Sequence, residues 1–297
     1  MIGVAPEQGP TVADLRAGGE VEGVFACARK DRLTARSGTT YLALELRDRT
    51  GSIPGRAFRD ADFLAGRFER GDLVRVSGRV ERFRDELQID VRGIVRVEEK
   101  MDPAAFLPMA YRDLEELDGF LEHLAREVHD PDYRGLLNAV LEDDAFRESL
   151  RRAPCSRGGH HAYLGGLIEH TVAVATLAAE ACLLHPRLNS DLLTTAALLH
   201  DIGKVREFHY SAEIELSDEG ALVGHITLGL ELISEWTERA GGLPREKALA
   251  LRHCVLGHHG PDALPGRRFR SAEALALYRL NSVDAAVKGA LEHGLPN

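Results

Sequence analysis

The stretch DLLTTAALLHDIGK, residues 191–204, is an apolar run that sets a histidine beside an aspartate, His200-Asp201. Its leucines and alanines recur at helical spacing, so it predicts a helix that closes at this pair. An imidazole next to a carboxylate is a combination of ligands that divalent ions of the Mn, Fe, Mg and Zn group accept. Because a His-Asp dipeptide is also common by chance, its meaning depends on the other histidines of the chain.

Three more segments place histidine within apolar sequence of helical period: His170 in GGLIEHT, His225 in VGHITLG, and His258-His259 in VLGHHG. Each has an ordinary explanation by itself. His170 would be a satisfied core residue, His225 a residue near a helix start, and the His258-His259 pair a favourable helix end. Burying several imidazoles in one helical core is costly unless a shared partner satisfies them. We therefore predict that these segments meet at one metal site.

The composition is that of an ordinary globular protein with room for about two domains. The chain has 297 residues, of which 44% are hydrophobic and 28% charged. No apolar run reaches the roughly 20 residues that cross a bilayer, and the N-terminus lacks the features of a secretion signal. The four cysteines, Cys27, Cys155, Cys182 and Cys254, have no CxxC spacing. They are typical of buried thiols in a reducing compartment, so we expect a cytoplasmic protein with no membrane partner.

Charge divides the chain into two parts. Residues 20–98 hold 16 Lys+Arg and 14 Asp+Glu, the rest of the chain holds 21 and 33, and the net charge is −10. This net charge argues against nucleic-acid binding over the whole surface. A near-neutral, arginine-rich part joined to an acidic part predicts two modules with different roles.

The pattern of residues 20–98 predicts five short strands. Apolar and polar residues alternate in VEGVFACARK, TTYLALELRD, GSIPGRAF, DLVRVSGRVERF and LQIDVRGIVRVE, and the amphipathic piece DADFLAGRFERG separates the third from the fourth. Five strands with a helical insert after the third is the layout of an OB-fold barrel. The segments LRDRTGSI and FERGDLVRVSGRVERFRDELQIDV resemble sequences of the OB family found in tRNA-binding and helicase-accessory domains.

In such a barrel, bases stack on aromatic side chains and phosphates follow a basic groove. The candidate nucleic-acid contacts are Phe25, Arg29, Tyr41, Arg47, Arg56, Phe58, Arg82 and Phe83, with Lys30 and Arg84 beside them. The alternative for the aromatic rings is that they fill the small core of the barrel. We expect single-stranded RNA or DNA to be the partner of this module.

Beyond the strands, residues 113–297 have a helical apolar period. Residues 1–19 are an N-terminal extension and residues 99–112 (EKMDPAAFLPMAYR) a linker with two prolines. About seven helices are predicted, in the segments LEELDGFLEHLAREV, YRGLLNAVLEDDAFRESL, GLIEHTVAVATLAAEACLL, LLTTAALLHDIGK, VGHITLGLELISEWTERA, REKALALRHCVLGHH and AEALALYRLNSVDAAVKGALEH, with a small hairpin near EFHYSAEIELSDEGALV. The fold class is β plus α, a five-stranded barrel followed by an all-α bundle. Apolar stripes around 113–150 either support a homo-oligomer or close the core.

The order H…HD…H…HH…D resembles the HD superfamily of metal-dependent phosphohydrolases. The segments HHAYLGGLIEHT, LLHDIGK, GHITLG and LGHHG, behind an OB module, are similar to its YhaM-type 3′→5′ exoribonucleases. The resemblance spans residues 20 to about 290. It implies an HD domain at 113–297 and a metal-dependent 3′→5′ exonuclease that releases nucleotides from single-stranded RNA, with single-stranded DNA as an alternative substrate.

The resemblance implies roles for the matching residues. His170, His200 and Asp201 would hold a first metal ion, and Asp201 would bridge to a second. The remaining ligands of the second ion would be His225, His258 and His259. Mn is the expected ion, with Mg, Fe, Co or Ni as alternatives.

The resemblance also implies residues that meet the substrate. Lys204 would point its ammonium group at a phosphate oxygen. His160 and His161 would contact the substrate phosphate or the leaving group. The alternative for this histidine pair is a solvated loop after the glycines of SRGGHH.

One position departs from the family's pattern. The family has aspartate at the first position of a DxxDA signature, whereas this chain has Asn281 there and keeps the second aspartate, Asp284. An amide oxygen can coordinate a cation but brings no charge. Asp284, at i+3, lies near the same helical face. Asn281 and Asp284 are therefore alternative ligands.

Two other functions stay open from sequence. One is hydrolysis of a small nucleotide, a dNTP or a cyclic dinucleotide, although such an enzyme has no need of a strand-binding barrel. The other is a non-catalytic nucleic-acid-binding protein with a degenerate HD site, which Asn281 favours.

Overall fold

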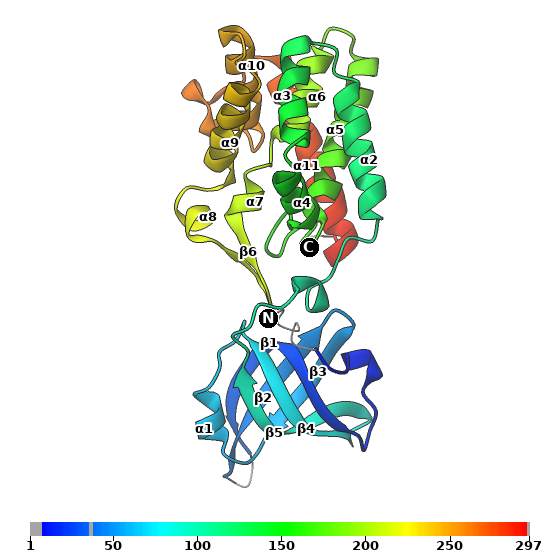
Figure 1. Cartoon of the computed structure of the whole chain (residues 1–297), viewed down its shortest axis with the longest axis vertical. Helices are drawn as coiled ribbons and strands as arrows, with labels where there is room; N and C mark the ends of the chain where they lie inside the picture. The colour runs from blue at the N-terminus through cyan, green and yellow to red at the C-terminus, as the bar shows by residue number, and fades with distance from the viewer. Residues whose placement is uncertain (1–7, 36–37, 296–297) are drawn as a thin grey trace, which may run out of the picture. The chain divides into compact units, whose positions relative to one another are not determined.

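The computed structural model describes residues 8–35 and 38–295, which form two compact units (Figure 1). One unit comprises Met1–Pro108 and Tyr210–Glu213, and the other comprises Met109–His209 and Ile214–Asn297. The division after Pro108 falls within the stretch 99–112 that the sequence marks as a linker. The segment Tyr210–Glu213, which the sequence placed in the helical part, belongs with the first unit.

The first unit is a closed barrel with the strand order β1-β2-β3-β5-β4. Its elements are β1 (Glu20–Thr34), β2 (Thr40–Asp48), β3 (Gly51–Ala57), α1 (Ala61–Ala65), β4 (Leu73–Phe83) and β5 (Glu86–Arg96). The barrel closes where β3 and β5 meet in parallel, at Gly55 opposite Ile89 and Arg56 opposite Asp90. Five strands with a helix after the third confirm the OB layout predicted from the sequence.

Strand β1 is long because it pairs with two strands. Its first half pairs with β4 and its second half with β2, and a bulge between Cys27 and Arg29 interrupts the second ladder. Both faces are covered before the bulge. Phe25 and Cys27 pack in the barrel core, while Val24 and Ala26 belong to a separate buried cluster. Simple alternation of buried and exposed residues therefore fails in this part of β1.

A two-residue turn, Arg84-Asp85, joins β4 to β5. Both residues have positive φ, 50° and 67°. This is the conformation of a type I′ turn, whose twist matches that of the two strands. Phe83 and Glu86 form the last pair of the ladder, and the Phe83 side chain is 56% exposed. The turn thus holds an aromatic ring at the solvent-facing end of the hairpin.

The second unit is the all-α domain predicted from the sequence. Its longer helices are α2 (Leu114–Arg126), α3 (Pro131–Leu141), α4 (Asp144–Arg152), α5 (Gly166–Leu184), α6 (Ser190–Leu199), α9 (His225–Arg239), α10 (Arg245–Gly257) and α11 (Ala272–His293). Between α6 and α9 lie α7 (Lys204–Glu207), the strands β6 (Phe208–Tyr210) and β7 (Ile214–Leu216), and α8 (Asp218–Leu222). The hairpin expected near 207–223 is therefore present, and a short helix follows it.

The segment 133–150 was predicted as one helix, and that prediction is wrong. Helix α3 ends at Leu141, and α4 begins at Asp144. The Asp143 carboxylate accepts a hydrogen bond from the backbone N–H of Phe146 and so caps α4. An aspartate favours an N-cap over a helix interior because its side chain bonds the backbone locally. The chain therefore breaks there although the apolar period continues.

Helix α5 is the core helix of the bundle and packs against α2, α4, α6 and α11 (Figure 1). It is the one helix of the described residues that is long and apolar enough to cross a membrane, with a mean hydropathy of 1.6. Half of that stretch is buried inside the unit. A helix that is apolar on all sides is expected in the core of a large helical domain. Its buried polar residues, Glu169, His170 and Thr171, therefore need partners inside the bundle.

Candidate metal centre and nucleic-acid-binding face

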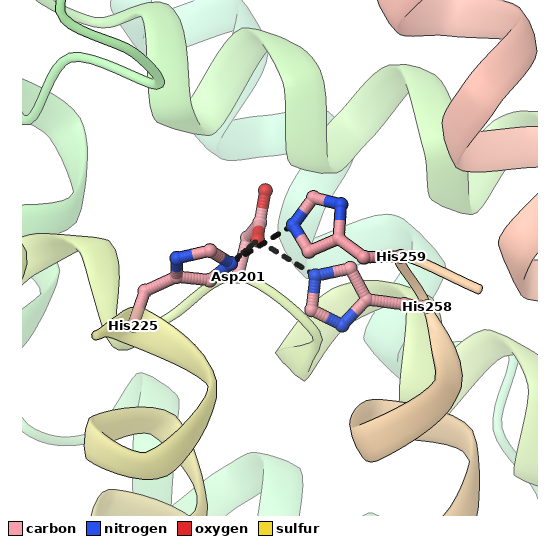
Figure 2. Close-up of side chains that lie close together, drawn as sticks. All are labelled: Asp201, His225, His258 and His259. Carbon is pink, nitrogen blue, oxygen red and sulfur yellow. Dashed lines mark hydrogen bonds and ion pairs between the residues drawn. The ribbon is translucent and has the colours of Figure 1, made fainter. Parts of the chain in front are cut away.

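Asp201 lies in the turn between α6 and α7 and is 1% exposed. Its two carboxylate oxygens face different histidines. Oδ2 is 3.4 Å from Nε2 of His170 and 3.4 Å from Nε2 of His200. Oδ1 is 3.3 Å from Nε2 of His258 and 3.5 Å from Nε2 of His225 (Figure 2). One carboxylate is thus placed to bridge two cations.

Two sets of ligand atoms share this carboxylate. The His170 cluster consists of His170, His200 and Asp201. The His225 cluster consists of His225, His258, His259 and Asp201 (Figure 2). Within each cluster the ligand atoms lie within 4.8 Å of one another. Helix α5, the α6–α7 turn, the start of α9 and the end of α10 therefore bring together the histidines that the sequence singled out.

Backbone carbonyls set the tautomer of two of the histidines. Nδ1 of His200 is 2.8 Å from the carbonyl oxygen of Ala197, and Nδ1 of His258 is 2.6 Å from that of Val255. A carbonyl only accepts, so Nδ1 is the donor in both rings. Nε2 is then left with a lone pair directed toward Asp201, which is the tautomer that a metal ligand requires.

Carboxylates play the same part for two other histidines. Nδ1 of His225 is 2.9 Å from Oε1 of Glu207, and Nδ1 of His170 is 2.6 Å from Oδ2 of Asp284. A carboxylate behind a ligating imidazole orients the ring and raises its basicity. Glu207 was not anticipated from the sequence. Its position directly before the hairpin carries no periodic signal.

The residues present fit bound divalent cations. Nε2 of His170 is 3.2 Å from Nε2 of His200, and Nε2 of His225 is 3.0 Å from Nε2 of His259. Nitrogen lone pairs that face each other this closely repel unless a proton or a cation lies between them. Oδ1 of Asp201 and Nε2 of His258 are buried and have no hydrogen-bond partner. Buried polar atoms are normally paired, and imidazole and carboxylate donors suit a divalent metal.

Lys204 governs the charge of the bridging carboxylate. Burial would raise the pKa of the Asp201 carboxyl, but the Lys204 ammonium group and the neighbouring His200 hold that pKa well below its usual range. The Lys204 Nζ lies 2.7 Å from Oδ2 of Asp201 and 3.4 Å from Sγ of Cys155. Burial would lower the pKa of Lys204, and Asp201 raises it. In this structure the ammonium group therefore pairs with Asp201, and its contact with a phosphate stays a prediction.

Burial favours the neutral form of three of the imidazoles. It lowers the pKa of His200 to about 4 and that of His160 to about 4. Partial burial and the neighbouring His258 lower the pKa of His259 to about 3. Neutral imidazole is the form that binds a metal. These rings therefore need no deprotonation at neutral pH.

His170 behaves differently. Burial would lower its pKa, but Cys155 and the hydrogen-bonded carboxylates Asp201 and Asp284 raise it to about 10. Without metal, His170 therefore carries a second proton, which occupies the gap toward His200. Metal binding at this cluster displaces that proton.

Asp284 lies behind His170, at the nitrogen that faces away from Asp201. Its Oδ2 is 3.0 Å from Nε2 of His161 as well as 2.6 Å from Nδ1 of His170. His161, His170 and Asp284 are close enough to hold an ion, but these distances are those of hydrogen bonds. In this structure Asp284 therefore orients His170, and its direct contact with a metal stays a prediction.

His161 is 1% exposed and has a positive φ of 53°. Besides Asp284, its ring contacts the Tyr163 hydroxyl, 2.9 Å from Nδ1. The expected contact between His161 and the substrate therefore needs correction, because both ring nitrogens are occupied inside the fold. His160 keeps a place beside the centre. It lies close to Cys155 and His170, and its Nδ1 is buried without a partner.

A chain of hydrogen bonds continues from His161. The Tyr163 hydroxyl donates to Oε2 of Glu169 at 2.6 Å, and the Lys288 ammonium donates to Oε1 of Glu169 at 3.1 Å. Burial would raise the pKa of Glu169, but its hydrogen bonds to His161, Tyr163 and Lys288 lower it. These residues were not anticipated from the sequence. A glutamate directly before His170 in an otherwise apolar helix was the available signal.

Asn281 is buried, 6% exposed, and its side chain contacts the backbone of a cluster histidine. Its Nδ2 donates to the carbonyl oxygen of His258 at 3.2 Å. The contact that the structure shows for Asn281 is therefore with the end of α10 and brings no negative charge to the centre.

On the barrel, strand register brings many of the predicted nucleic-acid contacts onto one face. Tyr41 pairs with Leu33 across β1 and β2, and its ring stacks on Phe58 with 5.1 Å between centroids. Side chains two residues apart share a face of a strand. The residues along this face line a groove of about 290 Å³, among them Arg29, Asp31, Leu33, Ala43, Glu45, Pro54 and Arg56.

A second hollow of about 290 Å³ adjoins this groove. Its lining includes Pro54, Arg56, Phe83, Arg84 and Gln88. The two hollows share Pro54 and Arg56 in their linings, and we call them together the barrel groove. Arg29, Arg56 and Phe83 therefore lie together as expected for a strand-binding surface.

Other predicted contacts lie elsewhere. Phe25 is 0% exposed in the barrel core, so its assignment to nucleic-acid binding is wrong and the core alternative holds. The Arg47 guanidinium donates to the carbonyl oxygen of Ala212 at 2.9 Å. Arg82 is exposed but lies on the opposite face of β4 from Phe83. Lys30 donates to the Ala65 carbonyl at 2.7 Å and so supports α1.

Comparisons with known proteins agree with this division. Residues 167–286 match the HD domain family, and residues 19–97 match the family described as OB-fold nucleic acid binding domain. The chain is 29% identical over 246 residues to the 3′-5′ exoribonuclease YhaM of Oceanobacillus iheyensis, covering 82% of this chain and 76% of that protein. It is 28% identical over 283 residues to YhaM of Shouchella clausii, covering 92% and 85%.

Among solved structures, the second OB-fold domain of replication protein A from Methanococcus maripaludis is similar to part of the chain. It is 23% identical, covers 31% of this chain and 98% of that one, and has a TM-score of 0.26.

Proposed function

We propose that this chain, an OB-fold domain followed by an HD domain with YhaM exoribonucleases as homologues over most of its length, is a metal-dependent 3′→5′ exoribonuclease. The proposal depends on the position of Asp201, because each of its two carboxylate oxygens faces a different set of histidines. A carboxylate bridging two imidazole clusters is suited to phosphodiester hydrolysis.

Divalent ions bound by the two clusters would activate a water and stabilise the charge that develops on the phosphate. We propose two ions, with Mn favoured because the two clusters offer imidazole and carboxylate but no thiolate. The protein's own groups prepare this site. Lys204 keeps Asp201 ionised, and Glu207 and Asp284 hold the tautomers of His225 and His170.

Exposure indicates the side from which a substrate phosphate arrives. His259 is exposed and His225 is half-buried, whereas His170 and His200 are each 0% exposed. A phosphodiester therefore meets the His225–His259 side of the centre first. The buried side excludes water, which strengthens every electrostatic interaction there.

The barrel groove supports a single-stranded partner. Arg29 and Arg56 line it and offer cations for phosphates, and the stacked rings of Tyr41 and Phe58 lie beside it, where Tyr41 pairs with the groove residue Leu33. Because groove and metal centre belong to one chain, a strand held on the barrel is at high effective concentration for the centre. RNA is favoured by the homologues, and single-stranded DNA is a further proposed substrate. A hydrolase of a small nucleotide would not need this groove.

The four cysteines are free, which is in keeping with the cytoplasm as the proposed location. The apolar stripes of α2 and α3 pack in the core of the bundle, as Leu117, Leu121 and Leu136 do. They therefore close the fold and give no support to the predicted homo-oligomer.

End-labelled RNA tests the activity. With Mn, 3′-labelled single-stranded RNA should release labelled mononucleotide at once, whereas 5′-labelled RNA should shorten in a ladder. Asp201→Ala should lower the rate on the order of a thousand-fold or more, as for loss of a preorganised catalytic group. Asp262→Ala, which removes an exposed carboxylate near the end of α10, is the matched control and should keep the wild-type rate.

Full binding of RNA without release of nucleotide, and with Asp201→Ala equal to wild type, would overturn the enzyme proposal. The protein would then be a nucleic-acid-binding protein with an inactive HD domain. Release of label from the 5′ end first would overturn the direction.

A further inference from the structure

We infer that the His225 cluster is the tight metal site of this chain, and that the His170 cluster takes a second ion much more weakly. The inference deepens the proposed function, because it takes the histidine centre to be a metal centre and asks in which order it fills. It departs from what the family resemblance implies, where His170 and the His200-Asp201 pair hold the first ion.

The His225 cluster has the stronger need for a cation. It offers four ligand atoms, from His225, His258, His259 and Asp201 (Figure 2). Two of them, Oδ1 of Asp201 and Nε2 of His258, have no hydrogen-bond partner, although these residues are 1% and 0% exposed. A buried acceptor without a partner costs free energy, and an ion between these atoms removes that cost.

The His170 cluster is already partly satisfied. It offers three ligand atoms. Its carboxylate oxygen, Oδ2 of Asp201, holds the buried Lys204 ammonium group at 2.7 Å. A divalent ion at this oxygen would lie close to that positive charge inside the fold, where charges are poorly screened. The same lysine is on the other side of the carboxylate from the orphaned Oδ1.

Charge also limits the second ion. Asp201 is the one carboxylate among the described residues of the two clusters. Asn281, where the family has an aspartate, donates to the His258 carbonyl and adds no charge. Once the first divalent ion has bound, the shared carboxylate is more than neutralised. The second ion then meets a positive centre, so its affinity falls.

Solvent access also favours binding of the first ion at the His225 cluster. The His225 cluster includes the exposed His259 and the half-buried His225, whereas His170, His200 and Asp201 are 0–1% exposed. An ion from solvent therefore reaches the His225 cluster without rearrangement of the core.

Mn(II) binding to the chelator-stripped full chain tests the order. We expect two dissociation constants that differ by at least about tenfold, the size of change that a weakened ligand environment causes. With one equivalent of Mn, electron paramagnetic resonance should show an isolated ion. Further Mn should convert this signal to that of a coupled pair, because the two clusters share Asp201.

A matched pair of variants assigns the sites. His259→Ala, in the His225 cluster alone, should weaken the tight ion at least about tenfold. His170→Ala should remove the weak ion and change the tight constant far less than His259→Ala does, because His170 supplies no ligand atom to the His225 cluster. His123→Ala, which removes an exposed histidine of α2, should change neither constant. Thermal unfolding of the metal-free variants checks that each still folds.

Restoring the carboxylate gives an independent check. Asn281→Asp should tighten the weak ion and bring the two constants closer together. Loss of the tight ion in His170→Ala with retention in His259→Ala would overturn the inference, and so would two equal constants in the wild type. If the His170 cluster binds Mn first and the protein still digests RNA, only this inference is wrong. If the His225 cluster binds Mn first but the protein does not digest RNA, only the proposed function is wrong.

Discussion

The metal centre and the barrel groove differ in how their residues are held. In the centre, Asp201, His170, His200 and His258 are 0–1% exposed, and every one of them is bound to another polar group. In the groove, Phe83 is 56% exposed, and Phe58, beside the groove, is 49% exposed. One region is a buried network, and the other is an open surface.

This difference predicts how each region responds to change. Groups in one buried network depend on one another, so losing one member affects the others. Exposed stacking and phosphate contacts act almost separately, and each contributes a modest share of the affinity. Variants of the centre should therefore alter metal binding and turnover. Variants of the groove should alter the binding of long strands alone.

Asp284→Asn should cause the largest change of three variants that test this contrast. The carboxylate that holds Nδ1 of His170 becomes an amide, so we expect metal affinity at the His170 cluster to fall about 10- to 100-fold. The Mn dissociation constants measure this effect. Arg279→Gln, at an exposed position of the same helix, is the control. Unchanged Mn binding in Asp284→Asn would show that the carboxylate does not support the ligand.

Tyr41→Ala should have an intermediate effect. Loss of one base-stacking ring costs about 1–3 kcal/mol, so binding of a long single-stranded RNA should weaken about 5- to 100-fold. Turnover of a dinucleotide, which the centre can bind without help from the groove, should stay unchanged. The control Phe63→Ala removes a ring of α1 that is 67% exposed and is not part of the Tyr41–Phe58 stack. Equal losses in the two variants would argue against a specific groove.

Asp143→Ala should have the smallest effect, since it touches neither region. Losing the cap of α4 should lower the free energy of unfolding by about 1 kcal/mol, measured by urea titration. The Phe146 N–H, with help from Arg239, lowers the pKa of Asp143 in the folded state. This stabilisation is therefore present above the unfolded pKa near 4 and is lost as the pH falls through the lower folded value.

The difference between wild type and Asp143→Ala should accordingly shrink as the pH drops below about 4. Asp144→Ala, which removes the neighbouring exposed carboxylate, should have a smaller effect with no such pH dependence. RNA digestion at neutral pH should be normal in both. A loss of activity in either would link α4 to the centre and weaken the contrast drawn above.

Much of the fold could be predicted because the spacing of apolar residues is a local property of the sequence. Apolar and polar residues that alternate along the chain predicted the barrel strands. Apolar residues at helical spacing predicted α5 and α11 with the bounds that the structure shows. The prediction failed where a local signal competed with the period, as at Asp143, and where an element is covered on both faces, as at Phe25. Alternation reports which residues share a face but not which face is buried.

The amino-acid sequence alone determined the two modules, their order, and the histidines and aspartate that could share a site. Only the tertiary structure decided which atoms each of these groups contacts and so which role each one has. It turned Oδ1 and Oδ2 of Asp201 toward different histidines, and set Asp284 behind His170. Residue spacing records which side chains a helix presents, whereas the atom that each side chain meets depends on how several helices pack. That packing is long-range, and so the roles of Lys204, Asp284 and Asn281 appear only in the folded chain.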